Sequence, residues 1–195
     1  GLPYEPTFQH SIAAGADVVL GSGDKLLGGP QCGIIVGNDK CVAKIRQHPL
    51  ARAVRVGKLT LAALGATLDS YTRDEARSEI PTQAMLFVTT EELQSRAEAI
   101  KQEIADGSDL RLTIRDDVSQ VGGGSLPAVE LPTVVIALKH QKLSADDLAV
   151  RLRTGRIGVF VRIQNNEVLL DIRSVLPEDD SRLALAVRLI RSEGR

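Results

Sequence analysis

The stretch Ser22-Gly23-Asp24-Lys25-Leu26-Leu27-Gly28-Gly29-Pro30 places one lysine on a glycine-rich turn between two short apolar runs. Ala16–Leu20 precedes the turn and Gly33–Gly37 follows it, and both runs have the length and β-branched content of buried strands. Lysine is rarely buried without a partner, and a low-dielectric environment favours the neutral amine that attacks an aldehyde. The residues therefore predict either a reactive Lys25 between buried strands or an ordinary glycine turn with a solvated lysine.

The neighbours of Lys25 give more specific expectations. The glycines at positions 21, 23, 28 and 29 permit backbone angles closed to other residues and allow a ligand to come close. Successive side chains of an extended backbone point to opposite sides. We therefore expect the Asp24 carboxylate to point away from Lys25, and we assign it no catalytic role.

The composition predicts a globular protein. Of the 195 residues, 43% are hydrophobic and 25% are charged, as in typical globular domains. The net charge of −1 provides no overall basic field for nucleic acid. No apolar run approaches the ~20 residues that span a bilayer, and two cysteines, Cys32 and Cys41, do not make a disulfide framework. We expect an intracellular, cytoplasmic protein with free thiols.

The pattern of elements predicts three parts. Residues 1–50 have the pattern of the end of an α/β domain, and residues 51–78 that of a long connecting helix, which we expect to run from Leu50 to Thr72. Its leucines recur at three- and four-residue steps, which predicts a face packed in the core. Residues 79–195 mix strands and helices in the manner of an antiparallel α+β domain.

Local signals support that last assignment. Thr89 and Glu92 form a capping box before an amphipathic helix, and Ser144 is a candidate N-cap for another. Asn165-Asn166 separates two apolar runs, 159–163 and 168–172, which predicts a hairpin. A last helix should bury an apolar face. Its members are Leu183, Val187 and Ile190.

The lysine stretch, read through Gln31 and the following Gly33-Ile34-Ile35-Val36-Gly37, resembles the cofactor-lysine signature of bacterial selenocysteine synthases, the L-seryl-tRNA(Sec) selenium transferases. The resemblance covers nearly the whole chain in order. It includes His48-Pro49-Leu50, Lys58-Leu59-Thr60, Val121-Gly122-Gly123-Gly124-Ser125-Leu126-Pro127 and Val168–Pro177. It implies the end of an aspartate-aminotransferase-like (fold type I) domain that binds pyridoxal 5′-phosphate, followed by an α+β small domain.

The resemblance also implies residue roles. Lys25 would carry the pyridoxal phosphate, and the Ser22 hydroxyl would bond the cofactor phosphate or only stabilise the turn. The reaction would convert seryl-tRNA(Sec) to selenocysteinyl-tRNA(Sec) with selenophosphate through an aminoacrylyl intermediate. No metal ligand is expected, since the three histidines have no cysteine or carboxylate at a ligand spacing.

Arg52 and Arg55 form a second candidate site. They are three residues apart, so on a helix they share a face, and two guanidinium groups can hold a tetrahedral anion. Spacing alone favours a solvated basic face near a helix end over an anion site. The family places arginines here that hold the phosphate-like part of the selenium donor, which favours an anion site; Lys58 continues the same face.

The resemblance also predicts what else belongs to such a protein. The sequence opens at Gly1-Leu2-Pro3, close to the lysine, and Met85 is its one methionine. We therefore expect this chain to be the C-terminal portion of a longer protein. The resemblance implies that the longer protein forms homo-oligomers, with a ring of dimers as one arrangement. Two alternatives stay open: a non-catalytic assembly fragment, or a related pyridoxal-phosphate lyase acting on a small amino acid or amino sugar.

Overall fold

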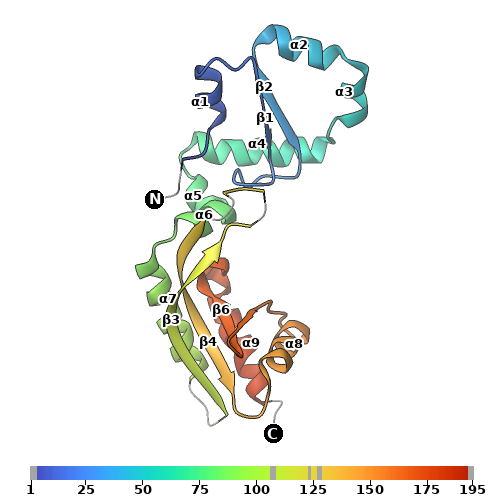
Figure 1. Cartoon of the computed structure of the whole chain (residues 1–195). Coiled ribbons are helices and arrows are strands. Elements are labelled where there is room, and N and C mark those ends of the chain that lie inside the picture. The colour runs from blue at the N-terminus through green and yellow to red at the C-terminus, as the bar shows by residue number, and fades with distance from the viewer. Residues whose placement is uncertain (1–3, 106–108, 123, 127–128, 193–195) are drawn as a thin grey trace. The chain divides into compact units, whose positions relative to one another are not determined.

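The chain folds into two compact units in a computed structural model that describes residues 4–105, 109–122, 124–126 and 129–192. The first unit comprises residues 1–84 and 121–129, and the second comprises residues 85–120 and 130–195. Both units mix helices and strands (Figure 1), which confirms the predicted mixed α/β class. The domain boundaries predicted after residues 50 and 78 stay predictions.

The first unit is built on an antiparallel hairpin. Strand β1 (Val18–Ser22) pairs with β2 (Gly33–Gly37) from Val18 opposite Gly37 to Ser22 opposite Gly33. Both predicted strands are present, with β1 two residues later than expected. The ring of Phe8, from helix α1 (Phe8–Ala13), packs so closely on the hairpin that a Cβ on Gly21 would lie 2.4 Å from it. A larger residue at position 21 would therefore require the Phe8 ring to move.

The prediction that these strands are buried is wrong. A two-stranded sheet has no interior strand, and in the described part of the unit little covers its outer face. Leu20 is consequently 72% exposed, and Ile35 is exposed as well.

Among the described residues of this unit, four further helices lie wholly within it: α2 (Asp39–Gln47), α3 (Pro49–Val54), α4 (Lys58–Thr72) and α5 (Ala76–Glu79). Helix α6 (Pro81–Phe87) spans the division between the units. The single helix predicted from Leu50 to Thr72 is wrong, because the chain leaves helical geometry between α3 and α4. Arg55 has extended angles (φ −61°, ψ 137°), and Gly57 is the N-cap of α4.

Helix α4 also lacks the buried apolar face expected of it. Leu59 is 82% exposed, and Leu61 and Leu68 are exposed too. The buried apolar side chains described in this unit are few: Ala76, Ile80 and Leu126. The unit therefore carries apolar side chains that its own fold does not cover. Large exposed apolar surfaces commonly mark interaction sites.

The second unit has a four-stranded antiparallel sheet with the order β3-β4-β6-β5. Its strands are β3 (Leu110–Gln120), β4 (Glu130–His140), β5 (Arg162–Gln164) and β6 (Glu167–Asp171). β3 and β4 pair along all eleven residues of each, from Leu110 opposite His140 to Gln120 opposite Glu130. The predicted hairpin is confirmed, since Asn165 and Asn166 both have positive φ, as a type I′ turn requires.

One face of this sheet is covered by three helices, α7 (Thr90–Ile104), α8 (Ala145–Thr154) and α9 (Asp180–Ser192), which share one core with it. The 3₁₀ turns η1 (Ile172–Ser174) and η2 (Pro177–Asp179) lead from β6 to α9. The capping box of Thr89 and Glu92 and the cap by Ser144 are confirmed. So is the buried face of α9. In the described part of the chain, every helix is too short or too polar to serve as a transmembrane span.

A buried arginine joins three segments of the second unit. Arg173, only 7% exposed, donates hydrogen bonds to the carbonyl oxygens of Met85 (2.8 Å), Val88 (3.1 Å) and Pro132. Burial lowers the pKa of its guanidinium, and the nearby Asp171 opposes that effect. These bonds connect the segment before α7 to the start of β4.

We expect Arg173→Met to destabilise the second unit by about 3 kcal/mol, because it leaves buried carbonyl groups without donors. Amide hydrogen exchange of β4 in the intact chain measures this loss. The control is Arg182→Met, since Arg182 is exposed and pairs with Asp179 at the surface; it should cost about 0.5 kcal/mol or less. Equal effects of the two changes would contradict the role assigned to Arg173.

Candidate functional site

The turn that carries Lys25 is closed by backbone hydrogen bonds. The Gly23 N–H donates to the Cys32 carbonyl (2.9 Å), the Gly29 N–H to the Gly23 carbonyl (2.8 Å), and the Gly28 N–H to the Lys25 carbonyl (2.9 Å). A Cβ on Gly23 would lie 2.5 Å from the Cys32 sulfur, and Gly28 has φ +72°. The glycines are therefore needed to build the turn itself, which holds Lys25 in a defined place.

Two side chains from distant helices fix the residues that follow Lys25. The Tyr71 hydroxyl on α4 donates to the Leu27 carbonyl (3.0 Å), and the Gln83 amide on α6 donates to the Leu26 carbonyl. The Tyr71 hydroxyl is protonated at neutral pH, and burial raises its pKa further above the ordinary value of 10.0. Sequence reasoning missed both anchors, since Tyr71 and Gln83 are 44 and 57 residues away from their partners.

Ser22, Asp24 and Lys25 form a continuous polar chain. The Ser22 hydroxyl donates to one carboxylate oxygen of Asp24 (2.6 Å), and Lys25 Nζ donates to the other (3.1 Å). The first bond, and then the second, hold the pKa of the Asp24 carboxyl below its ordinary value of 3.8. The prediction that Asp24 points away from Lys25 is wrong, because the backbone turns at Gly23 and Asp24 instead of continuing as a strand.

Lys25 is not enclosed as the buried-strand interpretation required. Its side chain is 45% exposed, since the flanking strands form an open hairpin. The loop between β3 and β4 comes near it: a Cβ on Gly124 would lie 3.8 Å from Lys25 Cε. The Glu5 carboxylate accepts a hydrogen bond from the Leu126 N–H (3.0 Å) and so holds this loop. Gly123 and Pro127 of the same motif lie outside the described residues.

This arrangement fits the aldehyde end of pyridoxal phosphate. A primary amine stands on a rigid turn, and one face of it is open to a ligand. The Ser22 hydroxyl is already bonded to Asp24, so the structure uses it to orient the carboxylate; a bond from Ser22 to the cofactor phosphate stays a prediction.

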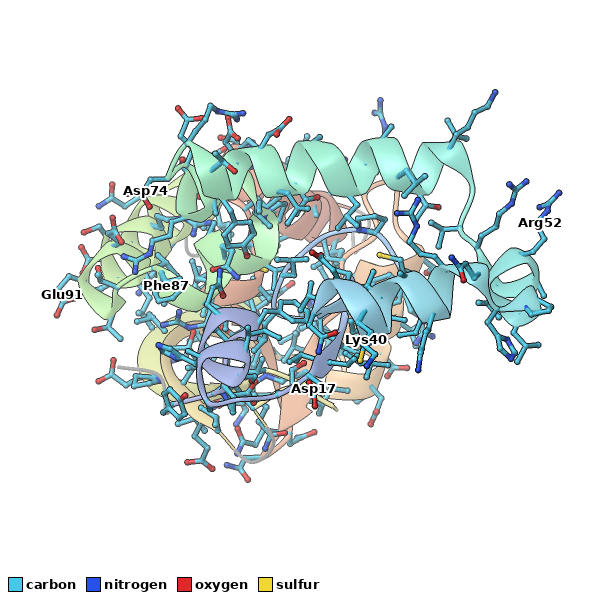
Figure 2. The ribbon with its side chains drawn as sticks, turned by 90° about the horizontal axis from the view of Figure 1, so that it is seen from above. Asp17, Lys40, Arg52, Asp74, Phe87 and Glu91 are labelled. Carbon is cyan, nitrogen blue, oxygen red and sulfur yellow. The ribbon has the colours of Figure 1, made fainter. Side chains whose placement is uncertain are left out.

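Arg52 and Arg55 do not share a helix face. Arg52 lies in α3, whereas Arg55 is its C-cap and has left helical geometry. The geometric argument for an anion fork is therefore wrong, and the predicted anion site rests on the family resemblance. Figure 2 shows Arg52 pointing outward from α3. Lys58 begins α4 and does not continue the face of α3.

The histidine and cysteine residues considered in the sequence have a structural role or no role assigned to them. The His48 ring nitrogen accepts from the Leu50 N–H (3.2 Å) and caps α3. Cys32 and Cys41 are free thiols. Within the described ranges, no group of three or more histidine, cysteine or acidic side chains is placed to hold a metal ion.

Comparison with known proteins identifies the family. Residues 1–176 match the family described as L-seryl-tRNA selenium transferase. The chain belongs to this family. The corresponding transferase of Geobacter metallireducens is 46% identical over 191 residues, which are 96% of this chain and 41% of that protein. That of Alkaliphilus oremlandii is 47% identical over 180 residues, 91% of this chain and 38% of the relative.

The chain thus spans about two fifths of the length of these curated relatives. The family is one of enzymes whose cofactor is pyridoxal phosphate. Among solved structures, a D-glucosaminate-6-phosphate ammonia-lyase resembles the chain with a TM-score of 0.59 and 24% identity, over 93% of this chain and 45% of the lyase. At that identity the likeness shows a shared fold and nothing about substrate.

We expect Ser22→Ala to raise the pKa of Asp24 toward its ordinary value, because the largest stabilisation of the carboxylate is removed. A lowered pKa means that the Asp24–Lys25 contact persists above that pKa and is lost as pH falls through it. The variant should therefore lose the contact at a higher pH. Carbon NMR titration of the Asp24 carboxyl measures the change.

Ser78→Ala is the matched control, since the Ser78 hydroxyl donates to the Glu75 backbone carbonyl and not to a carboxylate. An Asp24 titration that is identical in both variants would show that Ser22 has no influence on the carboxylate.

Proposed function

We propose that this chain is the lysine-bearing part of a selenium transferase that converts seryl-tRNA(Sec) to selenocysteinyl-tRNA(Sec), with selenophosphate as donor. The observation that carries the proposal is the 46% identity to a named transferase over 96% of the chain. In this proposal the first unit belongs to an aspartate-aminotransferase-like, fold type I cofactor domain, and the second is the α+β small domain.

Lys25 is the residue that attaches pyridoxal phosphate. When bound, the cofactor withdraws electrons from the substrate Cα. Lys25 then serves as the acid and base that moves protons at the substrate Cα and its neighbouring atoms. Asp24 holds Nζ from one side at 3.1 Å, and Ser22 fixes the carboxylate that does so. The hydrogen-bonded turn keeps the Ser22, Asp24 and Lys25 side chains close to one another.

The second part of the proposal assigns Arg52 and Arg55 to the anionic selenium donor. Both side chains are exposed, and no ion pair within the described residues engages either of them. Unpaired guanidinium groups are available to a phosphate-like group. We further propose that the whole protein acts in the cytoplasm as a homo-oligomer, built as a ring of dimers.

A lyase acting on a small amino sugar is not favoured. The ammonia-lyase with the similar fold is 24% identical, whereas named selenium transferases are 46% to 47% identical over the same region.

Borohydride reduction tests the cofactor lysine. We expect this chain, mixed with equimolar pyridoxal phosphate and then reduced, to carry the label mainly at Lys25, as found by peptide mass mapping. Lys25→Ala should lose that label, whereas Lys139→Ala, a change at an exposed lysine of β4, should keep it. Labelling spread evenly over the lysines would contradict the assignment.

A chimera tests the reaction. This chain replaces the aligned 191 residues of the Geobacter metallireducens relative, and selenium transfer to seryl-tRNA(Sec) is compared with ammonia release from free serine and amino sugars. We expect transfer to the tRNA, reduced about 100-fold or more by Lys25→Ala, because proton transfer alone contributes at least that factor. Activity on small substrates alone would refute the proposal.

In the same chimera, Arg52→Ala and Arg55→Ala should each raise the KM for selenophosphate about tenfold to a hundredfold, since a charged hydrogen bond is worth about 1.5–3 kcal/mol. The control is Arg77→Ala, on α5. An unchanged KM would remove these arginines from the donor site.

A further inference from the structure

Residues 39–58, here called the basic arm, carry an unusual concentration of positive charge. The segment comprises α2, α3 and the first residue of α4, and it contains six basic residues and one acidic residue, a net charge of +5 in a chain of net charge −1. Figure 2 shows Lys40 on α2 and Arg52 on α3. The basic residues are Lys40, Lys44, Arg46, Arg52, Arg55 and Lys58.

These cations are exposed and unpaired. Each of the six is an exposed residue, and none of them forms an ion pair or side-chain hydrogen bond within the described ranges. Elsewhere in the same unit, by contrast, Arg73 pairs with Glu75 and Glu79. The charge of the arm is therefore free to attract an anionic ligand.

Two of the positions are unfavourable for the helices that carry them. Lys40 lies in the first turn of α2, and Lys58 is the first residue of α4; the helix dipole disfavours a cation at both places. Lys40 and Lys44 are also four residues apart on one face of α2, where like charges repel and destabilise a helix. Lys44 lies in the last turn of α2, where the helix dipole favours a cation. Helix stability therefore accounts for a lysine at position 44 but not for one at position 40.

The size of the arm favours a polyanion. With a rise of 1.5 Å per residue, the nine residues of α2 extend about 14 Å, which is longer than a single phosphate-like group. A selenium donor held by Arg52 and Arg55 would leave the charges of α2 without a ligand. The RNA of the proposed substrate has a repeating phosphate backbone of the required charge and length.

We propose that Lys40 and Lys44, on the exposed face of α2, bind the phosphodiester backbone of the RNA substrate. The inference rests on the proposed function for the choice of RNA. These two lysines contact phosphates, so they contribute affinity and position the RNA without reading its sequence. Their binding releases counterions and is therefore weakened by salt.

Binding of a tRNA(Sec) transcript to this chain, followed by fluorescence anisotropy between 50 and 200 mM salt, tests the proposal. For Lys40→Gln combined with Lys44→Gln, we expect the slope of log affinity against log salt to fall by about 2. The Kd at 50 mM salt should rise about tenfold or more. The control is Lys139→Gln with Lys142→Gln, which removes the same charge from exposed lysines of the second unit, of which Lys142 pairs with Asp109; it should change RNA binding little.

Several results would overturn the inference. They are equal weakening by both pairs, no weakening by either, no measurable RNA binding by the unchanged chain, and competition by inorganic phosphate or polyglutamate as strong as by RNA. Borohydride labelling of Lys25 in the same variants separates the two proposals. Loss of RNA binding with Lys25 labelling kept supports the lysine pair, while intact RNA binding without any labelling of Lys25 refutes the cofactor assignment alone.

Discussion

The contact between the Asp24 carboxylate and Lys25 Nζ is the interaction on which the geometry of the candidate site depends. It exists because Gly23 bends the chain directly before Asp24, and the bend is closed by the hydrogen bond from Gly23 to Cys32. A side chain at Gly23 would collide with the Cys32 sulfur. The Ser22 hydroxyl then fixes the carboxylate from its other side. The Lys25 amine is thus held by a backbone constraint and not by burial.

The two units differ in how far they bury their apolar side chains. The second unit places three helices on one face of a four-stranded sheet and closes its own core. The first unit has a two-stranded sheet, and a sheet of that size is at most marginally stable alone in water. Its exposed leucines and isoleucines therefore stand on a surface suited to contact with further protein. That difference agrees with a chain that spans about two fifths of its relatives' length.

Charge is distributed as unevenly as apolar surface. The overall charge of −1 predicts no general attraction to nucleic acid, yet residues 39–58 carry a net charge of +5. The average concealed the segment, because the rest of the chain is acidic. Local charge on particular helix turns, compared with what the helix dipole favours, was more informative than the total.

Several features followed from the sequence alone. The family was recognisable from the lysine motif and the motifs after it, and the capping box of Thr89 and Glu92 and the turn at Asn165-Asn166 were predictable because their causes are local. Periodicity also located the buried face of α9. Tertiary structure alone decided the direction of Asp24, the anchors Tyr71 and Gln83, and the break between α3 and α4. Those features depend on backbone turns and on partners tens of residues away, which no local pattern encodes.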